Sequence, residues 1–133
     1  MDLFPILDTT YLILYTRYMS KFRFDIITLF PSLIEAYSNE SLIKRARMRK
    51  LVSIYAHQLR DFSIEKHQRV DEKPYGGGSG MVLMAAPIIR AVKSLSRSVT
   101  HKPKVILFSA KGKQFTLATA QAWTKKYQHL ILI

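Results

Sequence analysis

The sequence predicts an α/β protein in which crossover helices connect the strands of a parallel sheet. Short apolar runs alternate with amphipathic stretches along most of the chain, a pattern typical of this class. Hydrophobic residues make up 48% of the 133 positions, which is enough apolar material for the core of one domain. We therefore expect a single compact α/β domain.

The first half of the chain is expected to contain two strands and two helices before an irregular segment. Strands are indicated by apolar, β-branched and aromatic runs, and helices by apolar residues at helical spacing. Residues 60–80 are polar, charged and rich in glycine, so neither periodicity holds there. The expected elements are a strand over 22–29 (FRFDIITL), a helix from Ser32, a helix over 41–50 and a strand over 51–59.

Regular alternation resumes after residue 81. We expect a helix over 85–96, a short buried strand over 104–108 (KVILF), a helix over 114–127 and a strand over 129–133 (HLILI). A strand that is apolar on both faces belongs inside a parallel sheet, where helices cover both sides. Because the sequence stops on this strand, we expect an unfinished topology; the alternative is a central strand that truly ends the protein.

The charge balance favours a polyanionic partner. Lys and Arg number 21 against 9 Asp and Glu, which gives a formal net charge of +12. Such an excess promotes binding to polyanions by counterion release, so nucleic acid is the first expectation and an anionic membrane surface the second. A basic chain that is merely well solvated is the competing interpretation.

Cysteine is absent, which excludes disulfides, thiolate metal ligands and cysteine nucleophiles. This composition fits a reducing cytosol. The longest apolar run near the start, residues 11–15, is far too short to span a bilayer. We expect a cytoplasmic protein with no membrane partner.

Acidic residues end early in the chain. Glu72 is the last one, so no carboxylate in the second half can act as a general base or a metal ligand. His67 has four acidic neighbours in sequence, but the spacing matches no metal signature and favours a solvated loop. No metal site is expected.

Two loops have the composition of ligand-binding segments. Four of the five glycines fall within Gly76–Gly80, where positive φ angles and a close approach of backbone to a ligand become possible. Met81 stands where a dinucleotide fingerprint would need glycine. The second loop, Ser109–Gly112, follows an expected strand and precedes a helix, which is where a cofactor loop lies in an α/β domain. An ordinary surface loop is the alternative for the glycine-rich segment.

The densest basic cluster lies on the expected helix over 41–50. At 100° per residue its side chains spread around the helix, so phosphate contact and simple solvation are both open. His57 is expected to be a packed or edge residue, and Trp123 a core residue. The cluster consists of Lys44, Arg45, Arg47, Arg49 and Lys50.

Four segments together resemble the bacterial tRNA (guanine-N(1)-)-methyltransferase family. They are FDIITLFP (24–31), RDF (60–62), HQRVDEKPYGGGSGM (67–81) and ILFSAKGK (106–113). The resemblance runs from about Lys21 to Ile133 and leaves residues 1–20 as a non-family extension. That extension is interpreted as upstream sequence before a start at Met19, or as an added edge strand.

This resemblance implies a SPOUT-type α/β domain with a deep trefoil knot, acting as a homodimer with a small carboxyl-terminal domain. It also implies methyl transfer from S-adenosyl-L-methionine to N1 of the guanosine 3′ to the anticodon of tRNA. The implied cofactor-binding residues are Ser109, Ala110, Lys111 and Gly112. The implied residues of the tRNA cleft are His67, Arg69, Asp71, Tyr75, Gly76, Gly77, Gly78 and Gly80, to which the basic cluster adds Lys44 and Arg45.

In the family, the catalytic base follows a segment resembling CGRYEGxDER, which would lie beyond Ile133. We therefore expect 21–133 to be the amino-terminal part of the SPOUT domain, with the knot, the carboxyl-terminal domain and every catalytic residue absent. Such a chain is expected to be inactive by itself. Two alternatives stay open: a small basic RNA-binding protein without catalysis, and the remnant of a disrupted gene.

Overall fold

The computed structural model describes residues 22–97 and 102–133. Within these ranges a four-stranded sheet has the order β2-β1-β6-β5, and every neighbouring pair is parallel. The strands are β1 (Phe22–Thr28), β2 (Val52–Gln58), β5 (Lys104–Ile106) and β6 (His129–Leu132). The expected α/β class is confirmed, while the extension over residues 1–20 lies outside the described residues.

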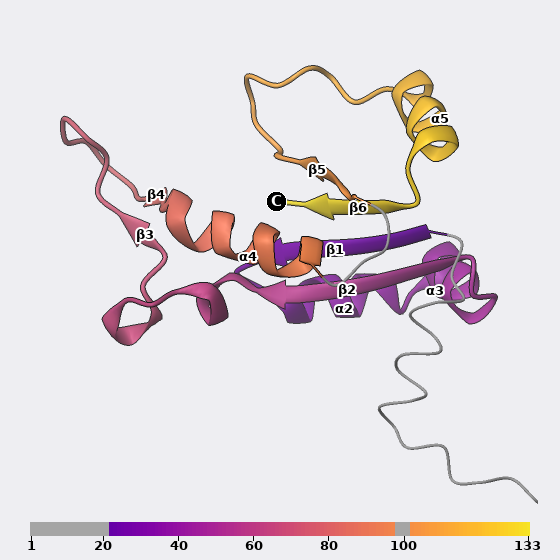
Figure 1. Ribbon diagram of the computed structural model, residues 1–133, viewed down its shortest axis with the longest axis horizontal. Helices are drawn as coiled ribbons and strands as arrows, with labels where there is room; N and C mark the ends of the chain where they lie inside the picture. Colours follow the sequence, from indigo (N-terminus) through magenta and orange to yellow (C-terminus); the bar gives the residue numbers. More distant parts are fainter. Residues whose placement is uncertain (1–21, 98–101) are drawn as a thin grey trace, which may run out of the picture.

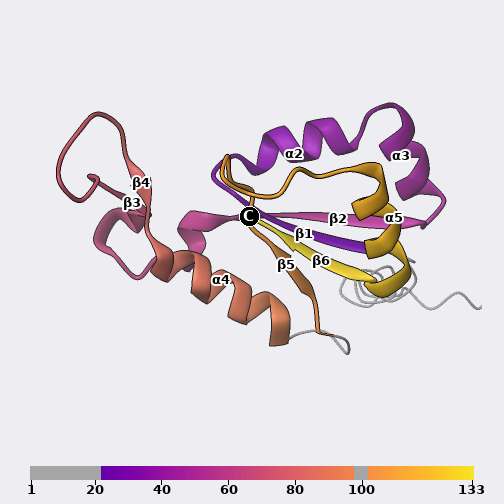
Figure 2. The same ribbon diagram turned by 90° about the horizontal axis from the view of Figure 1, so that it is seen from above.

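Helices cover both faces of this sheet (Figure 2). Helices α2 (Pro31–Ser38) and α3 (Ser41–Met48) lie on one face, and α4 (Ala85–Arg97) lies on the other. The path from β1 to β2 and the path from β2 to β5 cross the sheet in opposite directions, so right-handed crossovers must place their helices on opposite faces. Helix α5 (Leu117–Lys126) joins β5 to β6.

The core lies between α4 and the central strands. Side chains of β1 alternate between half-buried and buried, so every second residue faces α4. Val70, Ala91 and Ile131 are fully buried there. The whole cluster consists of Ile27, Leu59, Val70, Ala91, Leu95 and Ile131. The expectation that the last apolar run is an internal strand is confirmed, because β6 lies between β1 and β5.

The strand expected over 104–108 is shorter and more exposed than the sequence indicates. It ends at Ile106, and Val105, Leu107 and Phe108 are all exposed. The physical reason is position: β5 is an edge strand, so one flank lacks a neighbour. The prediction of a buried strand was wrong in this respect.

Local capping moves the start of the last helix. Thr116 has an extended backbone, and its hydroxyl accepts a hydrogen bond from the backbone N–H of Thr119, so α5 begins at Leu117 and not at residue 114. Trp123 is half-buried against Phe115 with ring centroids 5.4 Å apart, and α5 buries no residue completely. Trp123 was expected in the core, but it packs at the surface of the domain.

The irregular segment after β2 contains short structure that periodicity did not indicate. Two 3-10 turns, η1 (Leu59–Phe62) and η2 (Lys66–Gln68), precede an antiparallel pair. That pair joins β3 (Asp71–Glu72) to β4 (Val82–Leu83) and projects beyond the start of α4 (Figure 1). The glycine-rich loop forms the tip of this hairpin.

Candidate functional site

The turn Ser109–Gly112 lies at the carboxyl ends of the parallel strands. The backbone N–H of Phe108, just before the turn, donates to the carbonyl of Ile133 at 3.0 Å, which ties the loop to the end of β6. Within the turn, the N–H of Gly112 donates to the carbonyl of Ser109 at 3.0 Å. In open α/β sheets ligands bind at this edge. The position agrees with that of the expected cofactor loop.

The chemistry of this turn combines backbone, hydroxyl and apolar groups. The Ser109 hydroxyl accepts a hydrogen bond from the N–H of Lys111 at 3.3 Å. Leu107 and Phe108, which precede the turn, leave most of their side chains exposed. A Cβ added to Gly112 would lie 3.0 Å from the carbonyl oxygen of Ser109, so a larger residue would force the turn to shift. The four residues Ser109, Ala110, Lys111 and Gly112 are all exposed and available to a ligand.

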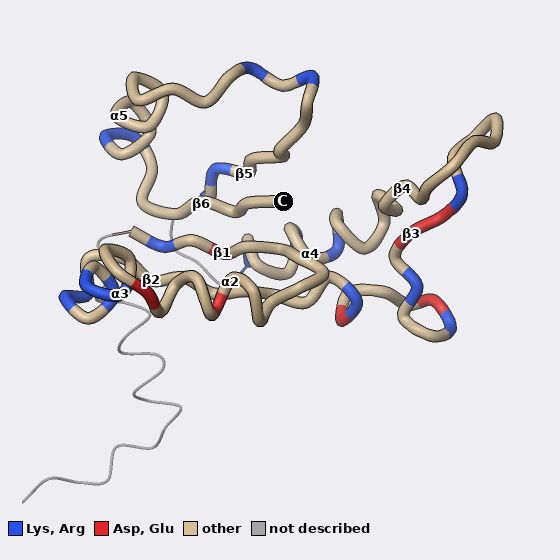
Figure 3. Tube along the Cα trace, turned by 180° about the vertical axis from the view of Figure 1, so that it is seen from behind, with Lys and Arg blue, Asp and Glu red and all other residues tan. Residues whose placement is uncertain are grey.

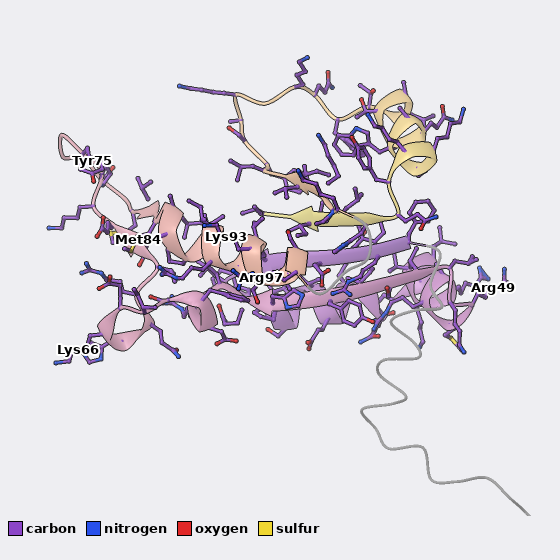
Figure 4. The ribbon with its side chains drawn as sticks, in the orientation of Figure 1. Arg49, Lys66, Tyr75, Met84, Lys93 and Arg97 are labelled. Carbon is purple, nitrogen blue, oxygen red and sulfur yellow. The ribbon has the colours of Figure 1, made fainter. Side chains whose placement is uncertain are left out.

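The hairpin β3–β4 presents the glycine-rich loop. Four glycines of this loop have positive φ values, which residues with a side chain rarely adopt. The values are 86° at Gly76, 81° at Gly77, 115° at Gly78 and 93° at Gly80. No atom lies within 4 Å of a Cβ added at any of the four, so conformation and not crowding requires glycine. Tyr75 is fully exposed near the tip, far from the sheet (Figure 4).

The base of the hairpin is anchored and its flank is basic. The N–H of Met84 donates to the carbonyl of the buried Val70 at 2.8 Å, next to the half-buried Asp71. His67 has a φ of 64°, an unusual value outside glycine. A cavity of about 370 Å³ lies here and is lined by Arg60, Glu65, Lys66, His67 and Arg69. Arg69 also pairs with Glu72 at 3.5 Å on the surface.

The predicted site residues fall in three places. The Ser109–Gly112 turn lies beyond β5, and the hairpin with the His67 cavity lies beyond the start of α4 (Figure 1). Lys44 and Arg45 belong to α3, at the amino end of β2 and so at the opposite end of the sheet. The structure therefore brings His67 and Arg69 together, but it places Lys44 and Arg45 on a separate surface.

A polar network inside the sheet was not predicted from the sequence. The carboxylate of Asp25 in β1 is fully buried and accepts hydrogen bonds from Arg23 at 2.7 and 2.9 Å. His57 in β2 lies with its Nε2 2.7 Å from Oδ1 of Asp25, and Nε2 of His129 in β6 lies 2.5 Å from Oδ2. The sequence feature that could have indicated it is Asp25, an acidic residue in the middle of an apolar strand. A buried carboxylate has to be paired with hydrogen-bond donors or cations. His57 was expected to be a packed or edge residue, and it is half-buried on β2, which is an edge strand of the sheet.

The electrostatics of this network favour the ionised carboxylate. Burial raises the pKa of Asp25, but hydrogen bonds from His129, His57 and Arg23, with the charge of Arg23, outweigh it and hold that pKa well below its usual range. Nδ1 of His129 is buried and has no hydrogen-bond partner among the described residues. Asp25 is thus a structural anion and not a proton acceptor for a ligand.

The described ranges 22–97 and 102–133 contain neither a cluster of metal-ligating side chains nor a helix that could span a membrane. No group of three or more His, Cys, Asp or Glu side chains in them is arranged to hold a metal ion. Within those same ranges, no helix combines the length and apolar character needed to cross a membrane.

Comparison with known proteins agrees with the geometry. A family model described as "tRNA (Guanine-1)-methyltransferase TrmD" matches residues 22–133. Proteins named tRNA (guanine-N(1)-)-methyltransferase are 45% identical in Ruminiclostridium cellulolyticum and 44% in Dictyoglomus turgidum, each over 111 residues and 84% of this chain. These alignments cover 47% and 44% of the two relatives, so the chain spans about half their length.

A solved structure shows the same fold. The crystal structure of tRNA (m1G37) methyltransferase from Aquifex aeolicus superposes with a TM-score of 0.74 at 31% sequence identity. The match covers 85% of this chain and 50% of that one. With the family model matching from Phe22 to the last residue, the chain belongs to the tRNA (guanine-1)-methyltransferase family.

Proposed function

We propose that this chain takes part in methyl transfer from S-adenosyl-L-methionine to N1 of the guanosine 3′ to the anticodon of tRNA. The proposal rests on the family match over residues 22–133. This match includes the Ser109–Gly112 turn and the glycine-rich loop Gly76–Gly80. The net charge of +12 supports a tRNA substrate, because it favours a polyanion. Residues 1–20 lie outside this match and are proposed to be a non-family extension.

The Ser109–Gly112 turn is proposed to hold part of the cofactor. When bound, S-adenosyl-L-methionine supplies the methyl group and leaves as S-adenosylhomocysteine. The turn fits such a group on one side: its Ser109 hydroxyl is exposed, and Leu107 and Phe108 offer apolar surface for an adenine ring. Backbone groups of Ala110 and Lys111 lie at the same edge and would complete the contacts.

The hairpin and its basic flank are proposed to approach tRNA. His67 and Arg69 line one cavity with Arg60, Lys66 and a single acidic residue, Glu65, so positive charges outnumber negative ones there. Asp71 sits at the base of the hairpin, and Tyr75 with Gly76, Gly77, Gly78 and Gly80 forms its exposed tip. Positive φ angles let the tip bring backbone N–H groups close to a phosphate or a base.

The proton on N1 of guanine needs an acceptor, and no residue of this chain is proposed for that role. Asp25 is buried and saturated with hydrogen bonds. No acidic residue follows Glu72 in the sequence, so neither the Ser109–Gly112 turn nor β6 carries a carboxylate. Transfer by this chain in isolation is therefore expected to be slow or absent.

A homodimer is proposed on the basis of exposed apolar side chains. Phe30, Leu33 and Tyr37 at α2 are each at least 60% exposed, as are Phe115 and Leu117 near α5. Large exposed apolar surfaces commonly mark an interface. Sedimentation velocity of the chain over a range of concentrations tests this part of the proposal.

The cofactor assignment is tested by isothermal titration of the chain with S-adenosyl-L-methionine, with S-adenosylhomocysteine as a second ligand. Micromolar binding that is lost in Ser109→Ala combined with Gly112→Ala supports the assigned turn. Methyl transfer is tested separately, with labelled cofactor and a tRNA transcript that carries guanosine 3′ to the anticodon. A transcript with adenosine at that position is the matched control.

A second candidate function is RNA binding without methyl transfer. It is favoured by the high net charge together with the lack of an acidic residue after Glu72. Binding of tRNA with no detectable affinity for S-adenosyl-L-methionine would select this candidate over the first.

A further inference from the structure

A basic cavity lies at the amino ends of β1 and β6, at the opposite end of the sheet from the Ser109–Gly112 turn. Its volume is about 280 Å³, and its lining includes Lys102, Lys125 and Lys126. Phe22 and His129, the first residues of β1 and β6, also line it. This amino-end cavity is therefore separate from the site proposed above.

The charge of the amino-end cavity is uncompensated by its own lining. The three lysines are exposed, and the described lining residues include no Asp or Glu. Gln128 adds an amide that can donate hydrogen bonds to an anion, whereas the hydroxyl of Thr124 already donates to the carbonyl of Gln121 at 2.9 Å. The cavity thus combines positive charge with a neutral amide donor.

The ring of Tyr127 lies close to two lysine ammonium groups beside the amino-end cavity. The ammonium of Lys126 lies 5.5 Å from the centroid of the Tyr127 ring, and that of Lys104 lies 5.8 Å from it. A cation over an aromatic face is attracted to it but keeps its full charge, unlike a lysine paired with a carboxylate. The ring therefore holds lysines near the cavity without neutralising them.

The dipole of α5 does not account for the arrangement. Lysines in the last turn of a helix complement its negative end, which explains Lys125 and Lys126. Lys102 and Lys104 come from the segment before α5 and have no such relation to the helix. Two separate parts of the chain thus converge with the same sign of charge.

The same end of the sheet also carries the cations of α3. Figure 3 shows basic positions on α3 and on α5 at this end of the molecule. Arg49, just after α3, lies at its extreme, whereas Lys93 and Arg97 lie on α4 over the opposite face (Figure 4). Lys44 and Arg45 therefore share an end of the sheet with the amino-end cavity and not with the hairpin.

We propose that the amino-end cavity binds a backbone phosphate of RNA, so that the chain contacts its substrate at both ends of the sheet. That the ligand is RNA rests on the proposed function. That the ligand is an anion is inferred from the three lysines of the cavity lining. Lysine binds phosphate as a point charge, which suits backbone contact without sequence reading. A concave lining with three lysines and an amide donor fits a single phosphate better than the plane of a membrane surface does.

The proposal is tested with Lys125→Gln combined with Lys126→Gln. Binding of fluorescent tRNA is measured by anisotropy over a range of salt concentrations, without S-adenosyl-L-methionine, so that failure of methyl transfer does not affect the result. We expect weaker binding, and a slope of log affinity against log salt that is shallower by about 0.7 to 1, the value for one lost phosphate contact. Lys102→Gln added to the pair should lower the affinity further.

The matched control is Lys93→Gln combined with Arg97→Gln, which removes the same charge from the last two turns of α4. This control should keep nearly the full salt slope. Equal losses in the two double variants would overturn the proposal, because net charge would then explain the effect. Unchanged tRNA binding in the α5 variant, with loss of binding to phosphatidylserine vesicles, would overturn it in favour of a membrane surface.

Discussion

The Nε2 atom of His129 lies 2.5 Å from Oδ2 of Asp25, although 104 residues separate the two in the chain. Asp25 is on β1 and His129 is on β6, which pair directly in the sheet. Arg23 and His57 complete the set of groups around the carboxylate. The network therefore links three adjacent strands through one buried anion.

Asp25→Asn should destabilise the fold strongly. The substitution leaves the buried guanidinium of Arg23 without its counter-ion, and breaking a buried ion pair from one side costs about 3 kcal/mol or more. Urea unfolding followed by circular dichroism measures the loss. Glu35→Gln on the exposed surface of α2 is the control and should change stability by less than about 0.5 kcal/mol. Equal midpoints for the two variants would contradict the structural role of Asp25.

Stability should also fall on acidification. The pKa of Asp25 is depressed in the folded state, so its contribution is fully present above the unfolded value of about 3.9 and is lost as the pH falls toward the folded value. The free energy of unfolding should therefore decrease between about pH 5 and pH 3. Asp25→Asn, which has no carboxylate at this position, should show a flatter pH profile. Parallel profiles would assign the acid sensitivity to other carboxylates.

The parallel sheet could be predicted from sequence because its signals are local. The runs over 22–29 and 129–133 are apolar over several consecutive residues, so each is recognisable as a strand without knowledge of the strand beside it. The exposure of Leu107 and Phe108 could not be predicted in the same way, since it follows from the edge position of β5. Edge position is a property of strand order, which local patterns do not contain.

The candidate site shows the same division. The Ser109–Gly112 turn was predicted at a strand end and lies there, because the signal is a strand followed by a glycine-containing turn. The partners of Asp25 come from strands far away in sequence, so only the register of β2 and β6 reveals them. β3 has only two residues, which is too short for an alternating pattern, so it could not be predicted from the sequence.

Val70→Ala should loosen the hairpin that presents the glycine-rich loop. Val70 is fully buried in the core, and its carbonyl accepts the N–H of Met84 on the other side of the hairpin. Removing two methyl groups from a packed site costs about 2 kcal/mol. Urea unfolding gives the global effect, and hydrogen exchange at β3 and β4 gives the local one. Val82→Ala is the control, because Val82 is 54% exposed; an equal loss in both variants would show that Val70 is not an anchor.

Gly112→Ala should weaken binding of S-adenosyl-L-methionine without unfolding the protein. The new Cβ would lie 3.0 Å from the carbonyl oxygen of Ser109, so the turn has to open while the core stays intact. We expect a loss of affinity of about three- to tenfold, which corresponds to about 0.7 to 1.4 kcal/mol. Isothermal titration measures it, and Gly77→Ala is the control, since that substitution strains the hairpin tip and not the turn. Unchanged affinity in Gly112→Ala would remove the Ser109–Gly112 turn from the cofactor site.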